Sequence, residues 1–102
     1  MLTKRTIQKK IADQATLIRK NGIKRIGLFG SYSRGEQQKD SDIDILIDFE
    51  EGKETFDNFM EICTLLDSMF KGKKVEVVTV GGLSPYIGPH ILNSVEYVQI
   101  AN

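Results

Sequence analysis

The sequence of 102 residues has no tryptophan, a single cysteine and only two prolines. One cysteine excludes a disulfide within the chain, and Cys63 lies in an apolar helical pattern that indicates a buried thiol. No apolar run approaches the ~20 residues of a membrane-spanning helix, and the first residues lack the apolar segment of a signal peptide. We therefore expect one cytoplasmic domain over residues 1–102, with a small core and no contact with a membrane.

Net charge is also absent, because 14 Lys and Arg residues balance 14 Asp and Glu residues. This balance gives no general signal for binding a polyanion, so we expect no direct binding of nucleic acid. The charges are unevenly spread: residues 1–25 hold eight basic residues and one acid, and residues 36–67 hold eleven acids and two lysines. The basic segment is either a solvated helix face or a surface that steers an anion or a partner.

Helical and strand-like patterns alternate along the chain. This order predicts an α/β (α+β) fold, with one small mixed sheet covered by helices. Thr3 is expected to cap the first helix, Gly22 to end it, and Pro89 to interrupt the last one. The expected elements are a helix at 3–21, strands at 23–29, 43–49, 75–79 and 95–100, a helix at 55–70 with Thr55 as its cap, and a short helix or two turns at 84–95.

The predicted helix at 55–70 is apolar on two sides. Its expected core stripe consists of Phe56, Phe59, Met60, Cys63, Leu66 and Phe70. A second stripe of Ile62, Leu65 and Met69 is displaced around the helix, and it is either buried or used at an interface with a partner. Apolar residues in the loop-rich segment after the third strand also suit docking; these are Leu83, Tyr86 and Ile87.

Acidic residues interrupt the second strand, in the stretch SDIDILIDF. Since strand side chains alternate between two faces, Asp42, Asp44 and Asp48 share one face and the isoleucines share the other. Same-face Cα atoms lie about 6.6–7 Å apart, so two carboxylates can reach one or two ions between them. A divalent cation would remove their mutual repulsion. The alternative is an edge strand whose acids face water.

The stretch GSYSRG follows the first apolar strand. Gly30 lets a ligand approach the backbone, and Ser31 offers a hydroxyl beside the N–H groups of a short helix. Phosphate donors beside a carboxylate pair predict a nucleoside triphosphate held through Mg²⁺. Arg34 either pairs with phosphate or closes the turn through a salt bridge.

Nucleotidyl transfer usually employs a third carboxylate, and Glu76 in VEVVT is the candidate. The alternative for Glu76 is an outward-facing residue of an edge strand. His90 is the only histidine and has no Cys or His partner at metal-ligand spacing, so we expect a packing or surface residue. Tyr32 and Tyr86 either stack on a base or pack in the core or on the surface, and we expect packing.

The stretch GSYSRG…SDIDILIDF resembles the signature of the nucleotidyltransferase superfamily that includes DNA polymerase β. The short chain, with VEVVT and LSPYIGPHILNSVEYV, resembles the minimal nucleotidyltransferases, which are commonly antitoxins paired with HEPN-domain ribonuclease toxins. The match spans residues 23–100, and it implies a polymerase β palm-like fold.

By this resemblance Gly30 and Ser31 would contact the triphosphate, with Arg34 beside them, and Asp42, Asp44 and Glu76 would hold two Mg²⁺ ions. Glu76 would be the third carboxylate, where the family more usually has aspartate. The implied reaction transfers AMP from ATP, or a nucleoside monophosphate from another triphosphate, to a hydroxyl of a partner HEPN toxin. Two alternatives stay open: a binding antitoxin that neutralises its partner by contact alone, and a transferase acting on a small molecule such as an aminoglycoside. The latter enzymes usually carry an extra substrate domain that we do not find in this sequence.

Overall fold

A four-stranded sheet forms the centre of the computed structural model, which describes residues 2–101. The strand order is β3-β2-β1-β4; β1 pairs antiparallel with both β2 and β4, and β2 pairs in parallel with β3. The strands are β1 (Ile23–Phe29), β2 (Ile43–Phe49), β3 (Val75–Thr79) and β4 (Glu96–Val98). The helices are α1 (Lys4–Asp13), α2 (Ala15–Lys20), α3 (Gly30–Arg34), α4 (Phe56–Met69) and α5 (Gly88–Ser94), with a 3₁₀ turn η1 (Val80–Gly82). The predicted mixed sheet is therefore confirmed.

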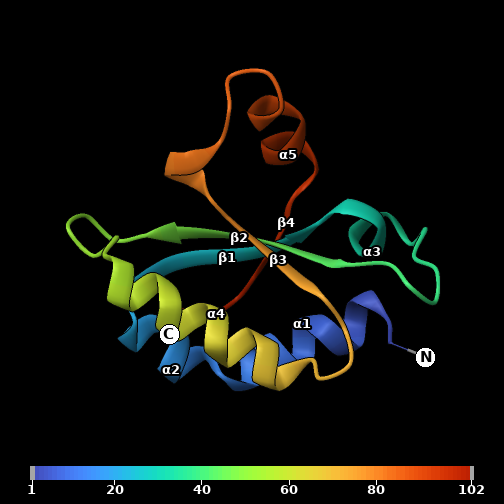
Figure 1. Ribbon diagram of the computed structural model, residues 1–102, viewed down its shortest axis with the longest axis horizontal. Coiled ribbons are helices and arrows are strands. Elements are labelled where there is room, and N and C mark those ends of the chain that lie inside the picture. Colours follow the sequence, from blue (N-terminus) through green and yellow to red (C-terminus); the bar gives the residue numbers. More distant parts are fainter. Residues whose placement is uncertain (1, 102) are drawn as a thin grey trace.

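The helices lie on both sides of this sheet (Figure 1). Helices α1, α2 and α4 cover one face, α5 stands above the other, and α3 lies at one end. Ile43, Ile45 and Ile47 of β2 are fully buried against the three-helix layer, as the alternation of the strand predicts. The core is completed by buried aliphatic residues of the helices, chiefly Ile7, Ile11, Ile18, Ile62 and Leu66. Asp44 consequently projects from the opposite face, toward the side on which α5 stands.

Both predicted threonine caps are present. Thr3 Oγ1 accepts a hydrogen bond from the Thr6 N–H at 3.2 Å, and Thr55 Oγ1 accepts one from the Asn58 N–H at 3.1 Å. The first helix differs from prediction, because the chain leaves the helical conformation at Gln14 (φ −105°, ψ 18°) and begins again as α2. No glycine or proline stands at this break, so the sequence carries no signal for it.

The last helix also differs from prediction. Pro89 does not interrupt α5 but lies in its first turn, where the missing N–H would have had no helical partner. The final strand is shorter than the expected 95–100 and covers Glu96–Val98. In residues 2–101, no helix has the length and apolarity needed to cross a bilayer.

Helix α4 presents the sheet with a different side from the one predicted. Its buried or partly buried residues against the core are Phe59, Ile62, Leu65, Leu66 and Met69, followed by Phe70. Phe56 is 77% exposed and Met60 is 44% exposed, and Cys63 is only partly buried. The prediction that Phe56, Met60 and Cys63 form core was therefore wrong. Of the two alternatives for Ile62, Leu65 and Met69, the structure shows the packing against the core. Both stripes have helical spacing, and the position of the sheet decides which one is buried.

Candidate active site

The strand register brings two acids together on the open face of the sheet. Asp44 lies opposite Glu76 in the parallel pair of β2 and β3, and opposite Phe29 in the antiparallel pair with β1. Residues paired across neighbouring strands point to the same face. Asp44 and Glu76 are therefore direct neighbours, although 31 intervening residues separate them in the chain.

Asp44 is the electrostatic centre of this group. Its side chain is partly buried, and this burial is the main cause that raises the pKa of its carboxyl. The negative charges of Asp42 and Glu76 raise the pKa of Asp44 further, while the positive charge of Arg34 lowers it. The structure therefore brings together four of the residues that the sequence singled out, within electrostatic reach of one another.

Glu76 combines features of both interpretations made from the sequence. Its side chain is 47% exposed on the edge strand β3, and Lys74 Nζ lies 3.4 Å from its Oε1. An exposed ion pair of this kind contributes little to stability, about 0–1 kcal/mol. Glu76 nevertheless faces Asp44 across the strand pair, so its carboxylate is available to the same ligand.

Gly30 lies against the carboxylate of Asp44. Its φ is +76°, a left-handed conformation that favours glycine. A Cβ atom at this position would overlap Asp44 Oδ2 and would lie 3.0 Å from Asp44 Cγ. Glycine is thus needed here both for the backbone turn into α3 and for the close approach of Asp44. Ser31 follows in the first turn of α3, whose N-terminus has no side-chain cap.

Arg34 ends α3 and makes the salt bridge that one interpretation predicted. Its Nε donates to Glu36 Oε1 at 2.8 Å, and both side chains are more than half exposed. This bond engages Nε alone, so the two terminal amino groups of the guanidinium can still donate to an anion. The turn-closing and phosphate-binding roles are therefore compatible.

Two adjoining cavities open between α5 and this end of the sheet. The first, of about 340 Å³, contains Asp44 and Glu76 with apolar walls from Val78 and Leu83, and we call it the acidic compartment. The second, of about 390 Å³, contains Gly30, Arg34, His90 and Ser94, and we call it the basic compartment. Phe29, Ile87 and Ile91 line both, so the compartments are two parts of one cleft.

A partly buried polar network holds α3 in place beside the cleft. Ser33 Oγ donates to Glu96 Oε2 at 3.2 Å, and Lys4 Nζ lies 3.0 Å from the same oxygen. Lys4 Nζ also donates to the Ser33 carbonyl oxygen at 3.4 Å. The hydrogen bond from Lys4, helped by that from Ser33, lowers the pKa of Glu96. The network links α1, α3 and β4, and no local sequence pattern predicts it because its members are far apart in the chain.

The acids fit a divalent cation by their chemistry. Asp42, Asp44 and Glu76 supply carboxylate oxygens, which hard cations such as Mg²⁺ prefer. Within residues 2–101, no three His, Cys, Asp or Glu side chains converge closely enough to hold a metal ion by themselves. Burial is the main cause of the raised pKa of Asp44, and the charges of Asp42 and Glu76 add repulsion that a cation between the acids would relieve. The predicted metal ligands are therefore close enough to influence one another electrostatically, but they do not form a complete metal-coordination site by themselves.

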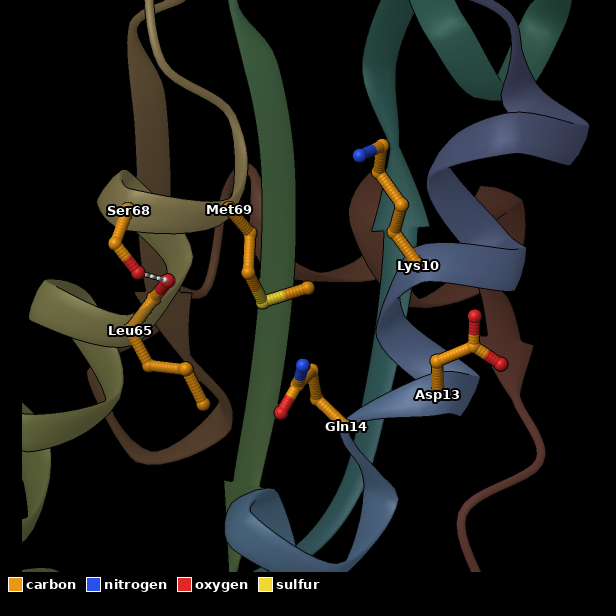
Figure 2. A pocket seen from close by; sticks show the side chains of 6 residues that line it. All are labelled: Lys10, Asp13, Gln14, Leu65, Ser68 and Met69. Atoms are coloured by element: carbon orange, nitrogen blue, oxygen red, sulfur yellow. Dashed lines mark hydrogen bonds between the residues drawn. The ribbon is translucent and has the colours of Figure 1, made fainter.

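A cavity larger than either compartment lies on the other side of the sheet. It measures about 440 Å³ and opens between α1 and α4, lined by Lys10, Asp13, Gln14, Leu65, Ser68 and Met69 (Figure 2). Ser68 Oγ donates to the Leu65 carbonyl oxygen at 2.7 Å, so this hydroxyl is already engaged. The cavity holds one carboxylate and no glycine-rich turn, and it lacks the parts that a nucleotide site needs.

Known proteins are similar to this chain in sequence and in fold. The profile of the family described as Nucleotidyltransferase domain matches residues 10–98. The protein adenylyltransferase MntA of Thermococcus cleftensis is 38% identical over 99 residues, which cover 96% of this chain and 98% of that protein. A solved protein assigned as a minimal nucleotidyltransferase is 29% identical with a TM-score of 0.78, covering 93% of this chain and 95% of that one. A solved toxin–antitoxin with AMP-PNP is 25% identical with a TM-score of 0.60, covering 90% and 72%.

Proposed function

Because this chain belongs to the nucleotidyltransferase domain family, as a minimal nucleotidyltransferase, we propose that it transfers AMP from Mg²⁺-bound ATP to a hydroxyl of a partner toxin. The chain is a nucleotidyltransferase. We propose ATP as its nucleotide, Mg²⁺ as its metal and a hydroxyl of the toxin as its acceptor. The observation that carries the proposal is the position of Asp44, paired in register with Glu76 and in contact with the backbone at Gly30.

In this proposal the acids act at the reacting phosphorus, and the glycine turn acts at the phosphates next to it. Asp42 and Asp44 would hold Mg²⁺, two ions when the site is complete, and the α3 turn at Gly30 and Ser31 would hold the phosphates. The metal, when bound, neutralises the charge that develops on the phosphates. The acceptor oxygen forms a bond to the α-phosphorus while the bond from that phosphorus to the bridging oxygen of pyrophosphate breaks.

The proton of the acceptor hydroxyl needs a base in the acidic compartment. Glu76 lies there beside Asp44, on the edge strand where an incoming acceptor can reach it. Its 47% exposure leaves the carboxylate accessible to the acceptor hydroxyl. Pyrophosphate leaves with its charge facing Arg34 in the basic compartment.

The acceptor comes from a partner protein in this proposal, as the toxin–antitoxin relative suggests. We propose a HEPN-type toxin as that partner. Tyr86 is 85% exposed and Ile87 is 61% exposed, and Ile87 also lines the cleft. These two residues form an apolar rim at its mouth, where a protein that inserts a hydroxyl side chain would dock.

The metal-nucleotide proposal is tested by titrating ATP with and without Mg²⁺ into the wild-type protein and the variant with Asp42→Asn and Asp44→Asn. We expect the Mg²⁺-dependent affinity to fall at least about tenfold in the variant. Asp48→Asn is the matched control, because Asp48 shares the strand face but binds Arg25 at 2.9 Å outside the cleft. Equal affinity of the double variant and the wild type would refute the proposal.

The docking proposal is tested with Tyr86→Asp, which should stay folded but no longer co-purify with a co-expressed HEPN toxin. Phe56→Asp is the control, since Phe56 is similarly exposed on the layer beneath the sheet. Loss of co-purification only in Phe56→Asp would place the interface on α4 instead.

The second candidate function is neutralisation of the partner by contact alone. It is favoured by Glu76 in place of the family's usual aspartate, since Glu76 is engaged with Lys74. The variant with Asp42→Asn and Asp44→Asn distinguishes the two functions in cells: it should fail to protect against the toxin if transfer is needed, and should protect fully if contact suffices.

A further inference from the structure

We infer that His90 binds the outer phosphates of the triphosphate from the α5 side of the cleft, an inference that rests on the proposed function. His90 lies in the basic compartment together with Gly30 and Arg34. The sequence marked it only as a packing or surface residue, because no motif connects it to the glycine turn. The fold makes this connection by placing α5 over the end of the sheet where α3 begins (Figure 1).

The charges along the cleft run from negative to positive. Asp44 and Glu76 lie in the acidic compartment, and among the described residues that line the cleft, Arg34 and His90 carry the basic side chains. Arg34 is near enough to Asp44 to influence its ionisation, so it lies toward the junction of the two compartments. A cation-bound triphosphate would match this order of charges. Its metal is bound by carboxylates, and the phosphate oxygens that the metal does not neutralise accept hydrogen bonds from donors.

The imidazole of His90 is available for this role. Within residues 2–101 its side chain makes no hydrogen bond or ion pair, and the residue is exposed. The backbone of His90 is held firmly, since its N–H donates to the Ile87 carbonyl oxygen at 3.1 Å and its carbonyl accepts from Ser94 Oγ at 2.9 Å. An imidazole carries at least one N–H donor whether it is neutral or charged, so His90 can donate a hydrogen bond to a phosphate oxygen.

Ser94 is the other polar residue that α5 contributes to the basic compartment, but its hydroxyl proton is already engaged. Ser94 Oγ lies 2.9 Å from the His90 carbonyl oxygen and 3.3 Å from that of Ile91. It can accept a hydrogen bond but has no second proton to give to a phosphate. His90 is therefore the donor that α5 offers to an anion at this position.

The test measures the dissociation constants of Mg²⁺–ATP and of Mg²⁺–tripolyphosphate for the wild type, His90→Ala and His90→Gln. We expect His90→Ala to weaken both about tenfold or more, as for the loss of a hydrogen bond to a charged group. His90→Gln keeps an N–H donor and should recover part of the affinity. Asn93→Ala is the control, an exposed neighbour in α5 that lines neither compartment, and it should bind like the wild type.

Wild-type affinity of His90→Ala for both ligands would overturn this inference while leaving the proposed function intact. An equal loss in His90→Ala and His90→Gln, accompanied by a lowered thermal midpoint, would also overturn it, because the role would then be structural. A wild-type protein that binds no Mg²⁺–ATP would overturn both the inference and the proposed function.

Discussion

Replacing Gly30 with alanine should disable the site without unfolding the protein. The change adds one methyl group at a position with φ of +76°, where the new atom would overlap Asp44 Oδ2 and crowd Asp44 Cγ at 3.0 Å and Cβ at 3.2 Å. These contacts are shorter than van der Waals packing allows, so the Asp44 carboxylate has to move. The backbone of β2 is held on both sides by its strand partners, which leaves the movement to the Asp44 side chain.

The expected magnitudes follow from these two effects. An alanine in the left-handed region costs about 1–3 kcal/mol, against a total stability of about 5–15 kcal/mol for a domain of this size. One kcal/mol lowers the thermal midpoint by about 4–8 °C in a domain of up to 100 residues, so the variant stays folded at room temperature. A shift of a reacting group by about 1 Å can reduce the rate about 100-fold. Transfer should therefore fall far more than stability does.

Gly35→Ala separates the two effects. Gly35 ends α3 with φ of +72°, and a Cβ atom there would meet nothing within 4 Å. This control carries the backbone cost without the clash, so it should lower the thermal midpoint yet bind Mg²⁺–ATP like the wild type. The assay is calorimetric titration of Mg²⁺–ATP alongside thermal unfolding of both variants. If Gly30→Ala binds within about threefold of Gly35→Ala, the reasoning about Asp44 is wrong.

Three further predictions concern the charges around the cleft. Asp44→Asn should raise the thermal midpoint near pH 7, because the raised pKa of Asp44 means that its ionised form destabilises the fold; the gain should fade as the pH falls through that pKa toward the usual value of 3.8, and a gain that is constant with pH would contradict this. Glu76→Gln should unfold like the wild type, since its ion pair with Lys74 is exposed, while transfer falls by orders of magnitude; an unchanged transfer rate would make Glu76 a surface residue. Lys4→Met should lower the midpoint near pH 7, because the lowered pKa of Glu96 means that its ionised form stabilises the fold; the effect should fade as the pH falls from the usual value of 4.5 through that lowered pKa, and an effect that is constant with pH in thermal scans would refute the role of Lys4.

The strands and the acids of the site could be predicted because their signals are local. The run at 43–49 alternates isoleucine with other residues and has turn residues on both sides, so its bounds and its two faces follow from the period of a strand. The same period places Asp44 away from the core. The close pairing of Asp44 with Glu76 also needs the register of β2 and β3, which no local pattern contains.

The features that could not be predicted depend on tertiary position. The two apolar stripes of α4 have the same helical spacing, and burial of Ile62 over Met60 depends on where the sheet lies. The bond of Lys4 to Glu96 joins residues 92 positions apart. His90 reaches the compartment of Gly30 only through the path of the chain over the sheet. In each case the local sequence permits more than one arrangement, and contacts between distant parts of the chain determine which one forms.

The crossover from β2 through α4 to β3 divides the cleft between two lengths of chain. Gly30, Asp42 and Asp44 precede α4, whereas Glu76 and His90 follow it, and the exposed turn around Gly72 lies between the two groups. Neither part holds all the residues of the proposed site, so the proposed nucleotide binding would require the two parts to associate in the native register. We therefore expect that two fragments cut at Gly72 would recover the proposed nucleotide binding when they reassociate. A slip of β3 by two residues would move Glu76 about 6.6–7 Å along the strand and away from Asp44. Nucleotide binding by the reassembled fragments would therefore measure the correct pairing of β2 and β3.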